Sequence, residues 1–226
     1  MSQSNLQIKF EHYLFKISSI HYLLHMVGNV YIGAMNMRGI RAPLPHPNIK
    51  ILNVTSAQAT DKPERTELSP MSAVIGKYKG YFCFENYWQA GKIIEGIDRQ
   101  TQLKWWKSQK SGKRRYPNSK GKRILYSEFD GIQRDYITSR KEIYVPLYYD
   151  LVKQKHVLAK WRKILEQYDI IVYDFDGPRN DNNEPITLEV TTEMLQEKIN
   201  DPLHPFGHGY VVAGILANIH PAQYIA

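Results

Sequence analysis

The chain has 226 residues, of which 42% are hydrophobic and 12% aromatic, so it can bury a core and does not have the composition of a disordered chain. No apolar run reaches the roughly 18 residues of a membrane-spanning helix, and the amino terminus has no signal-peptide pattern. The single cysteine, Cys83, excludes an intrachain disulfide and a zinc site built from several cysteines. We therefore expect a cytoplasmic protein with no membrane partner.

In chain order, the first third predicts only short elements. Residues 1–30 favour a helix or a pair of strands, and residues 33–50 are rich in glycine and proline, which indicates an irregular connection. The β-branched segment Ile49–Val54 predicts a strand, residues 55–67 a polar loop, and Gly80–Cys83 a second strand.

The remaining two thirds predict mainly helices. Hydrophobic periodicity indicates a long helical region in which Pro146 starts a second helix or introduces a kink. A β-branched run at Asp169–Asp174 predicts a strand that ends in a turn at Gly177. The predicted helices are Phe84–Glu95, Arg134–Tyr168, Thr191–Asn200 and Tyr210–Ile219.

Strands and helices are mixed without regular βαβ alternation, which is typical of an α+β fold. We predict a helix-rich single domain with a few short strands. Residues 68–226 are expected to form the catalytic core, and residues 1–67 an N-terminal extension packed on it.

One polar line marks the predicted helix Phe84–Glu95. Glu85, Gln89 and Lys92 are spaced i, i+4 and i+7 and therefore share one helical face. Large aromatic side chains flank this line, as at a pocket beside a core. The alternative is an ordinary surface face, because such ladders are common on exposed helices.

The same segment resembles the signature helix of the NADAR superfamily, in which a Glu is followed by an aromatic pair, a Gln-Ala and a Lys. Leu68-Ser69-Pro70-Met71-Ser72 is similar to that family's opening segment, and residues 209–219 are loosely similar to its closing helix. Known members are N-glycosidases that cleave a ribose–base bond or remove ADP-ribose from guanine. The resemblance implies that Glu85 is catalytic and that Gln89 and Lys92 bind substrate.

The sequence also departs from that family. Its usual His after the Glu is Asn86 here, and His208 stands where the closing segment has an Asn. Residues 1–67 have no counterpart, so the substrate does not carry over. By function alone, the chain is similar to small antiphage DNA glycosylases that remove glucosylated hydroxymethylcytosine, although no individual residues match.

N-glycosidic hydrolysis passes through a sugar with oxocarbenium character, which a carboxylate stabilises. Glu85 is the candidate for this role. We expect Lys92 to position a phosphate and Gln89 to hold a ribose hydroxyl or a base edge, with Asn86 beside them. Tyr87 and Trp88 are expected to form a stacking wall for the base.

Two further carboxylates follow the predicted strand Asp169–Asp174. Asp174 and Asp176 are spaced i and i+2, which places two side chains on one side of a strand. They are candidates for shared acid and base chemistry or for a divalent cation. The alternative is a plain turn, in which an aspartate before Gly-Pro bonds its own backbone.

A loop with two histidines precedes the closing helix. His208 is the candidate phosphate ligand or acid, because helix amino termini bind anions. His204 and His208 have metal-like spacing, but no third ligand is evident, so no metal and no cofactor are predicted. The alternative for each histidine is a backbone hydrogen bond in a tight loop.

The positive charge is concentrated in one stretch. The formal net charge is +8, and residues 104–123 contain nine basic residues and no acidic one. Aromatic residues accompany them, as in nucleic-acid-binding loops that neutralise phosphates and stack on bases. Arg38 is expected near the same site; the alternative is a solvated loop. The predicted nucleic-acid contacts are Lys104, Lys107, Lys110, Lys113, Arg114, Arg115, Tyr116, Lys120, Lys122 and Arg123.

The leading hypothesis is an N-glycosidase that acts on nucleic acid, with DNA as the expected partner, and removes a modified base or an ADP-ribosyl group. A second hypothesis is an N-glycosidase for a free nucleotide or NAD-like metabolite, which needs no basic loop. A third is a nucleic-acid-binding protein without catalysis, which would tolerate substitution of Glu85.

Overall fold

Four strands from distant parts of the chain form the larger sheet of the computed structural model, which describes residues 28–73 and 77–226. Their order is β2-β6-β1-β7. The two neighbours of β6 run parallel to it, whereas β7 is antiparallel to β1. The strands are β1 (Val30–Ala34), β2 (Lys50–Asn53), β6 (Ile170–Asp174) and β7 (Thr187–Glu189).

The central strand β6 is buried on both faces, because alternate side chains enter different cores. Val172 belongs to the main core together with the apolar helix α9 (His208–Leu216), which contacts β1 and β6. Ile171 and Tyr173 pack instead in a smaller cluster with Met35, Ala42 and Ile49, which are contributed by the connection between β1 and β2.

Because β1, β2 and β6 are parallel, their carboxyl ends meet at one edge of the sheet. Ligands of open parallel sheets bind at this edge. Asp174 ends β6 there, and Val54 follows β2 and donates its backbone N–H to the Tyr173 carbonyl oxygen at 3.1 Å. The fold thus brings residues from widely separated parts of the chain to a single edge.

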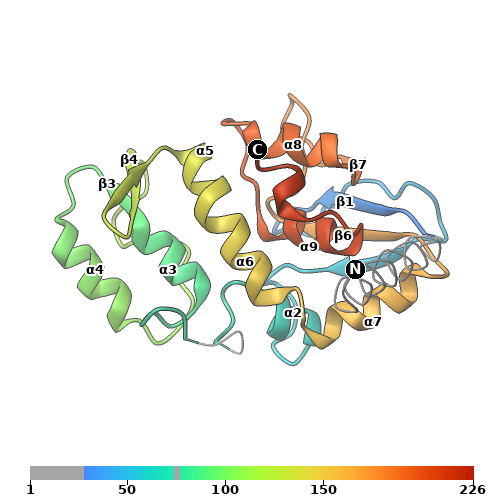
Figure 1. Ribbon diagram of the computed structural model, residues 1–226, viewed down its shortest axis with the longest axis horizontal. Coiled ribbons are helices and arrows are strands. Elements are labelled where there is room, and N and C mark those ends of the chain that lie inside the picture. The colour runs from blue at the N-terminus through green and yellow to red at the C-terminus, as the bar shows by residue number, and fades with distance from the viewer. Residues whose placement is uncertain (1–27, 74–76) are drawn as a thin grey trace, which may run out of the picture.

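A second, antiparallel sheet lies with two helices at the other end of the molecule (Figure 1). The Trp88 ring of α3 stacks on Phe129 of β4, with centroids 5.7 Å apart. The sheet has the order β3-β4-β5. The elements of this region are α3 (Phe84–Gly91), β3 (Lys92–Ile94), α4 (Arg99–Ser108), β4 (Ile124–Phe129) and β5 (Ile132–Arg134).

A segmented helix runs between the two sheets (Figure 1) and joins their cores. The ring centroids of its Tyr144 and Tyr148 lie 5.5 and 5.8 Å from the ring centroid of Phe84 in α3. Its last segment, α6, also contacts α9. Its segments are α5 (Tyr136–Ser139), η2 (Arg140–Tyr144), which is a π-helical turn, and α6 (Val145–Val152). The outer elements are α2 (Pro63–Leu68), α7 (His156–Leu165), α8 (Thr192–Asn200) and η3 (Pro221–Gln223).

The predicted α+β fold is confirmed: helices combine with two small sheets in a single domain. Within the described ranges, no helix has the length and apolar character needed to cross a bilayer. The predicted division of the chain after residue 67 stays a prediction. Residues 30–53 supply β1 and β2, which are both hydrogen-bonded to β6, so this part of the predicted extension belongs to the larger sheet. The helix or strand pair predicted for residues 1–30 lies mostly outside the described residues.

Several predicted elements are confirmed, and others are wrong. Strands at residues 50–53 and 170–174 and helices at residues 192–200 and 208–216 match the predictions closely. Gly80–Cys83 forms a turn and bends with an isolated Tyr78–Tyr81 bridge rather than a strand, and the end of the predicted loop 55–67 belongs instead to α2.

Two predicted helices are also shorter than expected. The helical region predicted for Arg134–Tyr168 is divided. Pro146 lies in the first turn of α6, in agreement with the prediction that it starts a second helix, and a further break separates α6 from α7. The helix predicted for Phe84–Glu95 ends at Gly91, so that Lys92 begins β3 instead of continuing the helical face.

Candidate active site

A cavity of about 520 Å³ opens where the two halves of the molecule meet. Its size lies within the range of small-molecule sites, roughly 300–1,000 Å³. Its wall combines α3 and β3, the sheet edge after β6, the start of α9 and the segment that follows α4. Of the predicted site residues, it is lined by Glu85, Gln89, Lys92, Arg114, Arg115, Tyr116, Lys120, Lys122, Asp174, Asp176 and His208.

Glu85 enters the cavity from the first turn of α3. The helical spacing brings Gln89 beside it as predicted, and the Gln89 Nε2 donates a hydrogen bond to Glu85 Oε1 at 2.7 Å. The backbone N–H of Glu85 donates to the Pro70 carbonyl oxygen at 2.8 Å. The Glu85 carboxylate therefore lines the cavity on a fixed backbone and has Gln89 as a neutral hydrogen-bond donor.

Lys92 reaches the same cavity from β3. Its Nζ lies 5.4 Å from the centroid of the Trp88 ring. Burial lowers the pKa of this ammonium from its usual value, while the carboxylates of Glu85 and Asp176 oppose the shift and Arg115 adds to it. The pKa of Lys92 thus responds to the carboxylates of Glu85 and Asp176 and to a cation of residues 104–123, which we call the basic segment.

Asp174 is held rigidly at the end of β6 and is almost fully buried, with 1% of its surface exposed. Its Oδ1 accepts the Phe175 N–H at 2.7 Å and its Oδ2 the Gly209 N–H at 2.9 Å. A Cβ on Gly209 would lie 2.5 Å from Asp174 Cβ, so only glycine allows this approach. Asp174 therefore already occupies the amino end of α9, where a phosphate was predicted to bind.

His208 joins two strand ends. Its Nε2 lies 2.8 Å from the Val54 carbonyl oxygen after β2, and its Nδ1 lies 3.2 Å from Asp174 Oδ2. A carbonyl oxygen only accepts, so Nε2 carries a proton and donates it to Val54. The ring is buried against Tyr148, whose centroid is 6.0 Å away, and a direct phosphate contact at either ring nitrogen would displace one of these partners.

Asp176 has a different environment from Asp174, although only one residue separates them. It lies in the turn after β6, and among the described residues no group donates a hydrogen bond to its carboxylate. The cavity walls and the charge of Asp174 raise its pKa to about 6, whereas His208 acts in the opposite direction. A carboxyl group with this pKa accepts and releases a proton near neutral pH.

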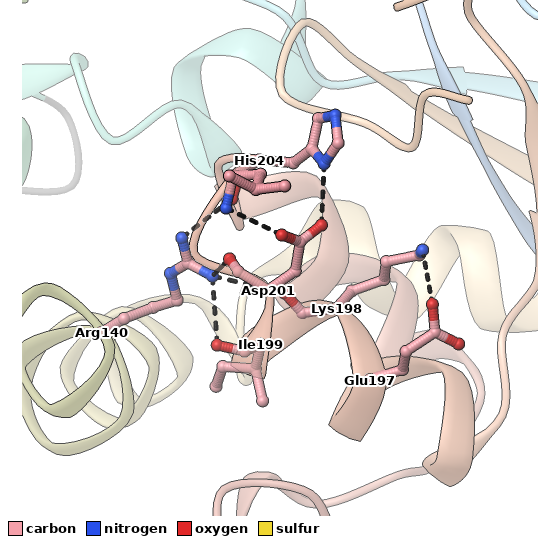
Figure 2. Close-up of polar contacts among 7 residues, drawn as sticks. Arg140, Glu197, Lys198, Ile199, Asp201 and His204 are labelled. Atoms are coloured by element: carbon pink, nitrogen blue, oxygen red, sulfur yellow. Dashed lines mark hydrogen bonds and ion pairs between the residues drawn. The ribbon is translucent and has the colours of Figure 1, made fainter. Parts of the chain in front are cut away.

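The loop that delivers His208 to the cavity is fixed by a buried arginine of η2 (Figure 2). The Arg140 guanidinium donates to carbonyl oxygens at the end of α8 and beyond it, including those of Asp201 at 3.0 Å and His204 at 2.9 Å. Asp201 Oδ2 also lies 2.7 Å from His204 Nδ1. His204 is thus engaged within this loop by Asp201, whereas His208 contacts Val54 and Asp174.

The segment after α4 forms the cationic side of the cavity. Arg114 donates to Ser56 Oγ at 2.5 Å, and its guanidinium carbon lies 5.3 Å from the centroid of the Phe175 ring. It is close enough to Asp176 to lower that residue's pKa. The basic segment is therefore attached to the carboxyl edge of the large sheet.

Three predicted substrate contacts, Asn86, Tyr87 and Trp88, do not line the cavity. Tyr87 and Trp88 are buried in the core, where both rings pack on Phe129, and neither lines the cavity. Asn86 is fully buried and binds the basic segment: its Nδ2 donates to the Ser111 carbonyl oxygen at 3.0 Å, and its Oδ1 accepts the Lys113 N–H at 2.8 Å. These residues follow Glu85 by one, two and three positions, so their side chains leave α3 in directions that differ from that of Glu85.

Other predicted contacts lie outside the cavity. Arg38 is exposed in the turn after β1 and does not line it. Arg123 pairs with Glu95 at 3.4 Å on the surface. The remaining basic residues of the segment are exposed without lining the cavity, namely Lys104 and Lys107 on α4 and Lys110 and Lys113 after it.

Sequence reasoning missed several residues of the cavity wall. Burial, and next the charge of Glu85, raise the pKa of the Tyr144 phenol well above its usual value, so it stays a neutral hydrogen-bond donor. Ser56 and Phe175 also line the cavity. Ser56 follows β2 and Phe175 follows β6, so both could be assigned to the sheet edge only once these strands were known to be parallel neighbours.

No cluster suited to a metal ion occurs in the described parts of the chain, where the search covers groups of three or more His, Cys, Asp and Glu side chains. Asp174 is in any case committed to two backbone N–H groups and His208. The arrangement instead offers proton transfer at Asp176 and charge stabilisation at Glu85.

Comparison with known proteins finds no matching family model, and neither the curated proteins nor the solved structures provide a significant match. The NADAR resemblance therefore stays a prediction, and the function must be argued from the geometry of the cavity.

Proposed function

We propose that this protein is an N-glycosidase that cleaves the bond between a sugar and a base in nucleic acid, with DNA as its partner. One observation carries the proposal: Glu85 lines a cavity of about 520 Å³ that is also lined by four cations of the basic segment, Arg114, Arg115, Lys120 and Lys122. A carboxylate for a developing sugar cation and cations for phosphates thus line the same cavity.

In the proposed reaction, the Glu85 carboxylate stabilises the positive charge that develops on the sugar as the bond to the base lengthens. Gln89 orients it through the 2.7 Å hydrogen bond. The geometry requires no covalent intermediate, because an electrostatic role already lowers the free energy of the charged transition state.

Asp176 is the proposed proton acceptor for the attacking water. A water oxygen bonds to the anomeric carbon and passes a proton to the Asp176 carboxylate, while the C–N bond breaks and its electron pair leaves with the base. The base nitrogen then takes up a proton. A pKa of about 6 leaves Asp176 mostly ionised at neutral pH yet able to return the proton.

The charge pattern favours a polyanion over a neutral substrate. Of the nine basic residues in the segment, only Arg123 has a carboxylate partner among the residues that the structure describes. Unpaired like charges repel one another, and phosphates relieve this repulsion. A free nucleotide would use the cavity but would leave the outer lysines without a role.

Mass spectrometry of released bases tests this proposal. Purified protein is incubated with modified and unmodified oligonucleotides, with ADP-ribosylated DNA and with free nucleotides including NAD. Release from DNA with loss of activity in Glu85→Gln supports the proposal. Release from free nucleotides alone would replace it with the metabolite hypothesis, and tight binding without any product would indicate a binding protein.

A further inference from the structure

The basic segment divides into two structurally different sets of cations. Arg114, Arg115, Lys120 and Lys122 line the cavity, whereas Lys104, Lys107 and Lys110 face solvent outside it. The inner set acts on the cavity floor, since the charge of Arg115 lowers the pKa of Lys92 and that of Arg114 lowers the pKa of Asp176. The two sets therefore present their charges to different places.

The residues on either side of Arg114 and Arg115 are held in place by several contacts. Asn86 binds both Ser111 and Lys113, and a Cβ on Gly112 would lie 2.7 Å from the Met71 carbonyl oxygen, so this turn packs directly against the cavity wall. The Tyr116 ring packs edge-on against Trp105, with centroids 5.1 Å apart. A cation on such an anchored segment offers a phosphate a defined position at a low ordering cost.

These observations connect the acid and the cations through two consecutive residues. Glu85 faces the cavity, and Asn86, on another face of the same helix, holds the basic segment. Helix α3 therefore carries both the carboxylate and the anchor of the turn that leads into Arg114 and Arg115. Among the described residues, no carboxylate pairs with any of the four inner cations, which leaves them available for a ligand.

We propose that Arg114, Arg115, Lys120 and Lys122 form a phosphate subsite at the rim of the cavity, and that Asn86 is its positioning residue. The ligand class is a phosphate ester or diphosphate, with its sugar directed toward Glu85. Lys104, Lys107 and Lys110 form a separate outer track that contacts only the more distant phosphates of a strand.

This inference rests on the proposed function only in taking the cavity as the place of binding. Binding is measured without turnover, so absence of glycosidase activity would not by itself affect the result. The probes are inorganic pyrophosphate, which fits one subsite, and a single-stranded ten-nucleotide DNA, which spans both sets.

The test compares two variants of the full chain with the same loss of charge. The inner variant is Arg115→Gln/Lys120→Gln/Lys122→Gln, and the outer variant is Lys104→Gln/Lys107→Gln/Lys110→Gln. All six side chains are exposed, so both variants are expected to fold. Pyrophosphate affinity should fall about tenfold or more in the inner variant, because charge-assisted phosphate contacts are lost, and stay within about twofold in the outer one.

For the ten-nucleotide DNA, both variants should lower the salt dependence of binding, by about 0.7 in slope for each phosphate contact removed. Asn86→Asp keeps an acceptor for the Lys113 N–H but places a carboxylate oxygen against the Ser111 carbonyl oxygen. Circular dichroism establishes that this variant is folded. It should then bind pyrophosphate more weakly while keeping the contacts of the outer lysines. Equal loss of pyrophosphate in the inner and outer variants, loss only in the outer one, or no loss in either, would overturn the subsite.

Discussion

The sheet edge and the basic segment line the same cavity but are built in opposite ways. At the sheet edge, Asp174 is 1% exposed and engaged by two backbone N–H groups and His208. In the basic segment, the cations are exposed, and in the described chain only Arg123 has a carboxylate partner. The fold itself thus satisfies Asp174 at the sheet edge, whereas it leaves the cations of the basic segment to be satisfied by a ligand.

The largest expected effect sharpens this contrast at Glu85. Glu85→Gln keeps the shape of the side chain but removes the charge that stabilises the sugar cation, so turnover should fall by about 10³-fold, within the range for a positioned carboxylate. DNA affinity, which depends on the basic segment, should remain. Quenched-flow release assays and fluorescence anisotropy measure the two effects, and full turnover in this variant would remove Glu85 from the reaction.

The next effect breaks the tight packing at the sheet edge. Gly209→Ala places a Cβ 2.5 Å from Asp174 Cβ and should destabilise the protein by about 1–3 kcal/mol, as overpacking does. Gly214→Ala on the same helix is the matched control, because its Cβ would lie 3.3 Å from a flexible Leu195 methyl group. Urea denaturation measures both variants, and equal stability would show that the approach to Asp174 is not constrained.

Asp176 predicts a smaller, pH-dependent effect. Its folded pKa of about 6 exceeds the ordinary value of 3.8, so the fold favours the protonated carboxyl group, and this stabilisation is lost as pH rises through 6. Asp176→Asn should therefore stabilise the protein at pH 8 by about 1 kcal/mol, after discounting for solvent screening, which corresponds to ~2–4 °C in Tm. At pH 3.5 the gain should disappear.

Activity adds a second readout for Asp176. In the wild-type protein kcat/KM should rise with pH through about 6, and this limb should be absent in Asp176→Asn. A limb that persists unchanged in the variant would assign the proton transfer to another group.

The smallest effect is expected for stability in the basic segment. Replacing Lys104, Lys107 and Lys110 by Gln should change the free energy of unfolding by less than about 0.5 kcal/mol, because these side chains are exposed and unpaired in the described chain. Thermal melts at low salt measure this. A loss comparable to that of Gly209→Ala would mean that the charges serve the fold.

Local spacing predicted the parts of the site that lie within one element. Glu85 and Gln89 are one helical turn apart and do form the expected hydrogen bond. Lys92 failed as a helical residue because α3 ends at Gly91, where the absence of a side chain admits the Phe129 ring. That ring comes from β4, so the close approach at Gly91 could not be read from the helix sequence alone.

Contacts between distant segments were beyond the sequence. Asp174 and His208 were each singled out, but their meeting depends on β6 and α9 lying at one sheet edge. Strand β1 was not predicted, because it overlaps the glycine- and proline-rich segment that indicated an irregular connection. Its Gly33 is required by packing against another strand, since a Cβ there would lie 2.7 Å from the Tyr173 ring. The aromatic residues Tyr87 and Trp88 beside Glu85 pack in the core instead of forming the predicted base-binding wall. The sequence could not separate these alternatives, because large aromatic side chains serve both purposes.

Hydrolysis in ¹⁸O-labelled water tests the central claim most directly, with products analysed by mass spectrometry after reduction of the abasic sugar that remains in the DNA strand. If Glu85 and Asp176 direct water to the anomeric carbon, a free base appears together with one ¹⁸O on the sugar and none on phosphate, and Glu85→Gln abolishes both products. Label on phosphate, or DNA binding with no base released from any substrate, would contradict the account.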